Sequence, residues 1–182
     1  TFWKMRASYS SVGNAPSRYL TIPTFGYSSS GEFETNTHMP VPELHPERTK
    51  SFEIGTNAKL FDGHVGLDFT YYKSNTYNQT FEAKASASSG YSTFYIQAGD
   101  IANWGIEAMV SYENKFGDLN WNSQLTFSMN RNEIKELVRD YPDPLTGELL
   151  NIPSLEVSKF GTYRMILEEG GSMGDIYVTS RL

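Results

Sequence analysis

The sequence contains no cysteine among its 182 residues. Disulfide bonds, cysteine-ligated metal sites and cysteine-based catalysis are therefore excluded for this chain. It also has no apolar run near the roughly 20 residues of a transmembrane helix, and its first residues lack the apolar core and cleavage site of a signal peptide. The net charge is −6 with scattered lysine and arginine, so a nucleic-acid partner, which usually requires a basic patch, is not predicted.

Aromatic residues and a strict alternation of apolar and polar residues are abundant instead. Aromatic residues make up 14% of the chain, chiefly 12 tyrosines and 11 phenylalanines. Apolar side chains recur at every second position in residues 4–12, 51–61, 64–72, 104–116 and 119–130, and none of these five apolar faces carries a charged residue. A period of two residues is typical of β-strands with one apolar face.

The lengths of these segments and of their connections indicate which kind of β-protein is present. The segments approach the ~9–11 residues of a tilted membrane strand and exceed the ~5–6 of an ordinary strand. Tight turns at residues 62–63 and 117–118 alternate with long polar stretches at residues 13–50, 73–103 and 131–160. Because transmembrane barrels have short turns at one end and long loops at the other, the fold class predicted is all-β: an antiparallel up-and-down meander, part of a large transmembrane β-barrel with long external loops.

The C-terminal third of the sequence carries weaker patterns. Residues 132–138 are compatible with one or two helical turns, and residues 160–167 with another strand. The glycine pair at residues 170–171 is expected to turn the chain into residues 176–178. Residues 1–182 as a whole are interpreted as a single region, because no linker and no repeat of fixed period interrupts them.

Reactive side chains are not arranged in a recognisable catalytic or metal-binding pattern. The three histidines, His38, His45 and His64, are not spaced as ligands of one metal ion, and no nucleophile-elbow motif or phosphate-binding glycine loop is present. The sequence therefore predicts no catalytic residue, no metal site and no cofactor.

Five aromatic residues in the expected external loops are candidate ligand-binding residues. They are Tyr77, Tyr91, Phe94, Tyr95 and Tyr141. Aromatic side chains are common in ligand sites, and sugar rings stack on their flat faces. The alternative is that these aromatics pack the loops against one another, and the sequence favours this alternative for any single residue.

A second aromatic group lies on the apolar faces of the expected strands. It comprises Trp104, Tyr112, Phe116 and Trp121, of which the last three are near a tight turn. Tryptophan and tyrosine gather at membrane–water interfaces, so the three residues near the turn are interpreted as an aromatic girdle. In a soluble protein the same side chains would form a hydrophobic core.

Several sequence motifs, in this order and spacing, carry a family resemblance. Residues 44–55 read LHPERTKSFEIG, residues 98–107 read AGDIANWGIE, residues 127–132 read FSMNRN and residues 168–170 read EEG. They resemble the C-terminal barrel region of SusC/RagA-type TonB-dependent outer-membrane transporters. Residues 44–55 are similar to that family's L-x-P-E-x-T-x-S-x-E-x-G entry into a barrel strand. Residues 98–107 are similar to its N-A-G-x-I-x-N-x-G-I-E motif, with Gln97 in place of the usual asparagine.

This resemblance implies a function that composition and spacing do not. The intact protein is expected to be a multi-pass β-barrel in the outer membrane of a Gram-negative cell, in contact with membrane lipid. It is expected to import oligosaccharides or peptides with a SusD-like surface lipoprotein, and to draw energy from TonB through an N-terminal part. The sequence is accordingly interpreted as a fragment without plug domain or TonB box, and not as an enzyme.

Two alternatives remain open at the level of sequence. The first is a soluble β-sandwich that binds carbohydrate, whose apolar strand faces would form a core between two sheets. It does not account for the strand lengths or for the alternation of short and long connections. The second is a secreted β-rich hydrolase, which lacks a catalytic constellation. Burial or exposure of Phe69, Val110, Trp121 and Phe127 distinguishes a sandwich core from a lipid-facing wall.

Overall fold

The computed structural model describes residues 1–182 apart from 23–24, 36–37, 42–43, 85–88, 143–146 and 179–182. The chain divides into two compact units. The first unit comprises Thr1–Val12, Thr49–Asn75 and Ala102–Asn132, and the second Gly13–Arg48, Thr76–Ile101 and Glu133–Leu182. Within the described part of the chain, no helix has the length and apolar character that membrane crossing requires.

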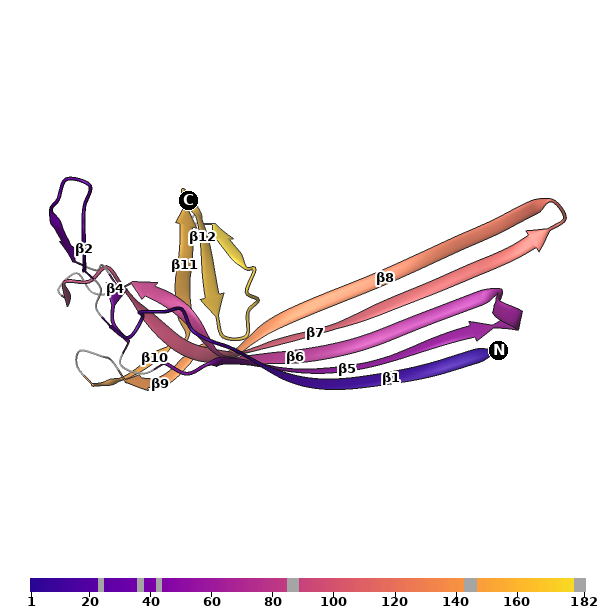
Figure 1. Ribbon diagram of the computed structural model, residues 1–182, viewed down its shortest axis with the longest axis horizontal. Coiled ribbons are helices and arrows are strands. Elements are labelled where there is room, and N and C mark those ends of the chain that lie inside the picture. The colour runs from indigo at the N-terminus through magenta and orange to yellow at the C-terminus, as the bar shows by residue number, and fades with distance from the viewer. Residues whose placement is uncertain (23–24, 36–37, 42–43, 85–88, 143–146, 179–182) are drawn as a thin grey trace. The chain divides into compact units, whose positions relative to one another are not determined.

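The first unit is a single layer that contains the larger part of each of five long strands. They are β1 (Phe2–Asn14), β5 (Glu47–Leu60), β6 (Val65–Lys84), β7 (Thr93–Phe116) and β8 (Leu119–Glu136), side by side in this order (Figure 1). The strand order follows the chain order, as expected of a meander. Because apolar and polar residues alternate along each strand, the apolar faces of these strands lie on the same side of the layer.

Neighbouring strands of this layer run antiparallel. Between β6 and β7, His64 accepts a backbone hydrogen bond from Glu113 at 2.8 Å, and further along the pair Tyr72 lies beside Gly105. The residue numbers thus rise on one strand as they fall on the other. The all-β antiparallel meander predicted from the sequence is confirmed.

Both predicted tight turns are present. Between β5 and β6 the chain reverses through the short 3-10 turn η1 (Phe61–Gly63), closed by a backbone hydrogen bond from His64 to Phe61 at 3.0 Å. Asp62 and Gly63 have φ of 52° and 97°, a left-handed region that glycine and aspartate tolerate better than most residues. Residues 117–118 turn the chain between β7 and β8.

All five long strands are longer than the sequence predicted, three of them by the most. β6 has 20 residues, β7 has 24 and β8 has 18, so that residues 73–84 and 93–103, expected as loop, are strand. The polar composition of these extensions predicts loops, and this prediction is wrong. Backbone pairing continues past the apolar segment, and in the second unit Phe81, Ile96 and Ile101 of these extensions are buried in a shared hydrophobic core.

The helical turns expected at residues 132–138 are also absent, because this segment belongs to β8 and β9 (Val138–Pro142). Ile134 and Leu137 are both fully buried. Their spacing of three residues imitates a helical period. This spacing arises because the chain bends at Leu137. The bend interrupts the alternation of side chains, so that the side chains after it again face the core.

Short sheets complete the second unit. β2 (Phe25–Tyr27) pairs with β3 (Phe33–Thr35), β4 (His38–Met39) pairs in parallel with β7, and β9 pairs with β10 (Leu149–Ile152). β11 (Ser154–Phe160), β12 (Tyr163–Glu168) and β13 (Ile176–Val178) form a three-stranded sheet. β12 and β13 match the strands expected at residues 160–167 and 176–178, whereas β11 lies in an expected loop.

The hydrophobic core of the second unit is closed by the segment that follows β12. The core consists of Phe81, Ile96, Ile101, Ile134, Leu137, Val138, Leu155 and Leu167. Gly170 and Gly171 exchange backbone hydrogen bonds with Ile134 at 2.8 and 2.9 Å, and a Glu169 side-chain oxygen accepts from the Leu137 backbone at 3.1 Å. The Tyr177 hydroxyl donates to Glu168 at 3.0 Å, which raises the pKa of this tyrosine.

Candidate functional site

The apolar face of the long-stranded sheet is exposed. Phe69, Val110, Trp121 and Phe127 leave 43%, 46%, 52% and 58% of their surface accessible. In a β-sandwich the corresponding side chains are covered by a second sheet. These exposures therefore contradict the sandwich alternative and leave a surface that an apolar environment would cover.

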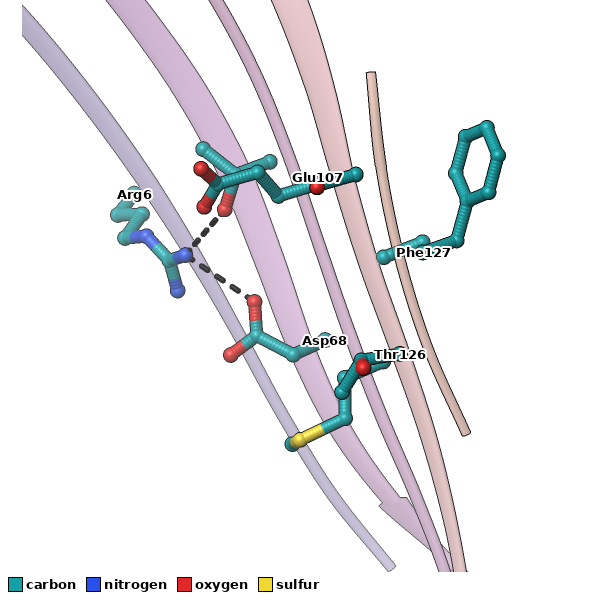
Figure 2. A pocket seen from close by; sticks show the side chains of 9 residues that line it. Arg6, Asp68, Glu107, Thr126 and Phe127 are labelled. Atoms are coloured by element: carbon teal, nitrogen blue, oxygen red, sulfur yellow. Dashed lines mark hydrogen bonds and ion pairs between the residues drawn. The ribbon is translucent and has the colours of Figure 1, made fainter. Parts of the chain in front are cut away.

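Charged and polar side chains are joined across three strands on the opposite face. Arg6 of β1 reaches over β5 and donates through Nη2 to Asp68 Oδ1 at 3.1 Å and to Thr70 Oγ1 at 2.5 Å (Figure 2). Asn57 donates to the second oxygen of Asp68 at 2.9 Å, and Glu53 lies 3.8 Å from the Arg6 guanidinium. The charges of Arg6, Glu53 and Asp68 are thus joined across these three strands.

A cavity of about 390 Å³ opens on this polar face. Arg6, Asp68 and Thr70 form one side of it, and Glu107 of β7 and Thr126 of β8 also line it. In Figure 2 the labelled side chains of Arg6, Asp68, Glu107 and Thr126 point to the same side of the strands, whereas Phe127 points to the other. One residue step along β8 thus separates a polar surface from an apolar one.

Glycines on the polar face leave room for long side chains to cross a strand. A methyl group at Gly55 would stand 2.8 Å from Nε of Arg6, so a larger residue in β5 would displace the guanidinium that reaches Asp68. Glycine within a strand often marks such a close approach.

A glycine on β7, Gly105, also leaves room for a side chain to cross the strand. The Tyr72 side chain extends from β6 over Gly105, and its hydroxyl accepts a hydrogen bond from Asn130 of β8 at 3.0 Å. The side chain therefore ties three strands together. Gly105 belongs to the family-like motif at residues 98–107, and the physical reason for a glycine there is not visible in the sequence, since Tyr72 is distant from it along the chain.

Metal-ligating side chains do not cluster in the part of the chain that the structure describes. Among the described residues, no group of three or more histidine, aspartate or glutamate side chains is placed to hold a metal ion. His64 Nδ1 pairs with the Glu113 carbonyl oxygen at 2.8 Å, and His38 Nδ1 with Thr93 Oγ1 at 2.5 Å.

Phe94 and Tyr95, neighbours at the start of β7, have different surroundings in the second unit. Phe94 packs against the hydrophobic core. The Tyr95 ring stacks on the imidazole of His38, with ring centres 5.3 Å apart and planes inclined by 28°. Partial burial and the charge of Glu82 raise the pKa of Tyr95, so its hydroxyl stays protonated well above neutral pH.

The remaining aromatic candidates do not gather with this stack in any shared cavity that the structure describes. Tyr77 is half-buried on β6, and its backbone lies in strand rather than in the expected loop. Tyr91 is half-buried in the segment before β7, where its backbone N–H donates to Ser89 Oγ at 3.2 Å. The side chain of Tyr141 lies outside the described residues.

A small cavity beside Tyr95 is not predictable from the sequence. It measures about 300 Å³, and Arg18, Tyr19 and His38 are among the residues that line it. Arg18 lies in a stretch without hydrophobic periodicity and far from Tyr95 in the sequence, so no sequence signal connects these residues.

The expected girdle residues of the first unit lie near the β7–β8 turn. Phe116 and Trp121 are exposed by 55% and 52%, and Tyr112 is half-buried, with its hydroxyl accepting a hydrogen bond from Asn114 at 2.9 Å. Such an arrangement of exposed aromatics with hydrogen-bonded polar atoms suits a membrane–water interface.

Comparison with known protein families gives a match along most of the chain. The sequence profile of the family described as TonB dependent receptor-like, beta-barrel matches residues 1–178. TonB-dependent receptor P3 of Formosa agariphila is 31% identical over 97% of this chain and 18% of its own length. TonB-dependent receptor P26 of the same organism is 29% identical over 81% of this chain and 16% of its own length. The chain thus spans less than a fifth of either relative.

Solved structures of similar fold include the RagAB peptide transporter. The superposition covers 93% of this chain and 18% of the transporter chain, with a TM-score of 0.68 and 20% identity. The RagAB peptide importer in its "open-open" state covers 100% of this chain and 22% of its own, with a TM-score of 0.61 and 18% identity. At these identities the likeness shows a shared fold.

Proposed function

Because the chain belongs to the TonB-dependent receptor-like β-barrel family, we propose that it forms part of the wall of a nutrient transporter in the outer membrane of a Gram-negative bacterium. In this proposal the exposed apolar face of the long strands meets lipid, and the polar face lines the interior of the barrel. The chain provides wall and binding surface and carries out no chemical reaction.

The separation of the two faces carries this proposal. Arg6, Asp68 and Glu107 share the polar face, whereas Phe69 and Phe127 stand exposed on the other. A charge near the middle of a bilayer costs about 2–4 kcal/mol on a barrel strand, so a lipid-facing surface must exclude charges. A soluble carbohydrate-binding sandwich would need a second sheet over the same face.

The transported nutrient is proposed to be an oligosaccharide or a peptide. Support comes from the motifs at residues 44–55 and 98–107, which resemble SusC/RagA-type transporters, and from a fold shared with a peptide importer. By the same resemblance, a SusD-like surface lipoprotein would cover the transporter and TonB would supply energy. Both partners would act on the full-length protein.

The aromatic residues away from the membrane-spanning segments are proposed to contribute to ligand binding to different degrees. Tyr95 borders a cavity and is the strongest candidate. Tyr77, Tyr91 and Tyr141 remain candidates. The packing of Phe94 against the core favours a structural role for that residue.

Gene deletion in the source bacterium tests the proposed function. The strain without the full-length gene and a strain without TonB are supplied with a mixture of fluorescently labelled peptides and, separately, with labelled oligosaccharides. We expect uptake of one class to fall to background in both strains and to return with a plasmid copy of the gene.

The location and the partner are tested on the full-length protein. It should fractionate with outer membranes, require detergent for extraction and copurify with a surface lipoprotein. Recovery of a folded, monomeric protein from the soluble fraction without detergent would contradict the proposal and favour a soluble binding protein.

A further inference from the structure

The small cavity beside Tyr95 has one rigid aromatic wall. The imidazole of His38 stacks on the Tyr95 ring, and its Nδ1 is held by the Thr93 hydroxyl at 2.5 Å. His38 also faces Thr93 in the parallel pairing of β4 with β7. Because backbone pairing and a side-chain hydrogen bond both fix the imidazole, this wall is already formed without a ligand.

The other walls of the cavity are mostly aliphatic. They consist of Leu20, Ile22, Met39 and Pro40, together with the exposed aromatic side chain of Tyr19. Met39 is buried, whereas 59% of the surface of Ile22 is exposed. Aliphatic side chains offer no partner to hydroxyl groups, and a hydroxyl buried without a hydrogen bond is unfavourable. The lining therefore suits an apolar side chain better than a sugar ring.

One guanidinium provides the charge of the cavity. Arg18 lines it, and among the described residues Arg18 has no ion-pair or hydrogen-bond partner. Glu82 is not among the lining residues, and its carboxylate faces His38 at 3.8 Å. An arginine binds a carboxylate through two parallel hydrogen bonds, so an anionic group of planar shape matches this end of the cavity.

We infer that this cavity binds the C-terminal residue of a peptide, with the terminal carboxylate on Arg18 and an apolar last side chain between Ile22 and Tyr95. The inference deepens the proposed import function and rests on it. The volume of about 300 Å³ is at the small end of ligand pockets, which suits one terminal residue rather than a whole peptide.

Calorimetry on the full-length transporter, purified in detergent with its copurifying lipoprotein, tests the carboxylate contact. The probes are Ala-Ala-Ala-Leu with a free C-terminus and the same peptide as its C-terminal amide. We expect the amide to bind at least about tenfold more weakly, as for the loss of a charge-assisted hydrogen bond. Arg18→Ala should weaken the free acid to the level of the amide and leave the amide unchanged.

Arg48→Ala is the matched control, since Arg48 is another exposed arginine of the second unit and does not line the cavity. It should keep the tenfold preference. The shift in electrophoretic mobility on heating shows whether each variant is a folded barrel. Ile22→Ser tests the apolar wall: it should weaken Ala-Ala-Ala-Leu and leave Ala-Ala-Ala-Gly unchanged.

The outcomes separate this inference from the proposed function. Equal binding of acid and amide, or an equal effect of Arg18→Ala on both, would overturn the carboxylate site even if TonB-dependent peptide uptake persists. Binding of maltohexaose that Arg18→Ala and Ile22→Ser both weaken would reassign the cavity to sugars. Absence of TonB-dependent uptake of any peptide or oligosaccharide would contradict the proposed function itself.

Discussion

The Tyr72 ring occupies the space over Gly105 that any other residue would fill with its side chain. A methyl group at Gly105 would stand 2.5 Å from Cζ of Tyr72 and 2.5 Å from the carbonyl oxygen of Met129 on β8. The Tyr72 hydroxyl then accepts from Asn130 at 3.0 Å. One glycine thus allows a side chain from β6 to reach β8 across the intervening strand.

Gly105→Ala should destabilise the barrel by about 1–3 kcal/mol, the usual range for overpacking. The reason is that the Met129 carbonyl belongs to the backbone and cannot move aside. Thermal unfolding of the full-length protein in detergent measures the change. Gly26→Ala is the control, because a methyl group there meets nothing within 4 Å. Adding Tyr72→Ala to Gly105→Ala should restore only part of the lost stability. Full restoration would show that the clash is with the Tyr72 ring alone and not with the Met129 carbonyl.

Leu125→Arg should block assembly in the outer membrane, whereas Gln124→Arg should allow it. Leu125 is 73% exposed on the apolar face, and its neighbour Gln124 contacts Met109 on the polar face. An arginine facing lipid near the bilayer centre costs about 2–4 kcal/mol. The amount of heat-modifiable protein in isolated outer membranes provides the measurement. Normal assembly of both variants would contradict the assignment of the faces.

Arg6→Ala should lower the melting temperature of the full-length barrel, and Lys4→Ala on the same face should change it little. Arg6 donates to both Asp68 and Thr70, and its removal leaves the buried Thr70 hydroxyl without this donor. Asp68→Asn combined with Arg6→Ala should lower the melting temperature less than the two single changes added together. Simple additivity would mean that the two side chains do not interact.

Leu137→Ala should destabilise the second unit by about 2–5 kcal/mol, as expected for a cavity in a closely packed core. Leu137 is fully buried, whereas Leu149 is 63% exposed, so Leu149→Ala should have an effect within about 0.5 kcal/mol. Hydrogen exchange of the β8 and β9 amides reports on this local stability. Similar exchange in both variants would show that Leu137 does not support the core.

Residues 132–138 illustrate where sequence patterns mislead. Ile134 and Leu137 are spaced as on a helix face, and yet Ile134 lies on β8 and Leu137 at the bend between β8 and β9. A strand that bends at a single residue loses its period of two, and the new spacing depends on the core that receives the side chains. A local pattern does not contain that information.

The sequence by itself determined which face of each long strand is apolar, where the two tight turns lie and which family the motifs resemble. These properties are local, because alternation, turn-forming dipeptides and the placement of charges act within a few residues. The tertiary structure alone decided how far the strands extend, why Gly105 must be glycine and that Arg18 shares a cavity with Tyr95. Such properties depend on backbone pairing between segments distant in the chain, and the residues of one segment do not specify which neighbour it meets.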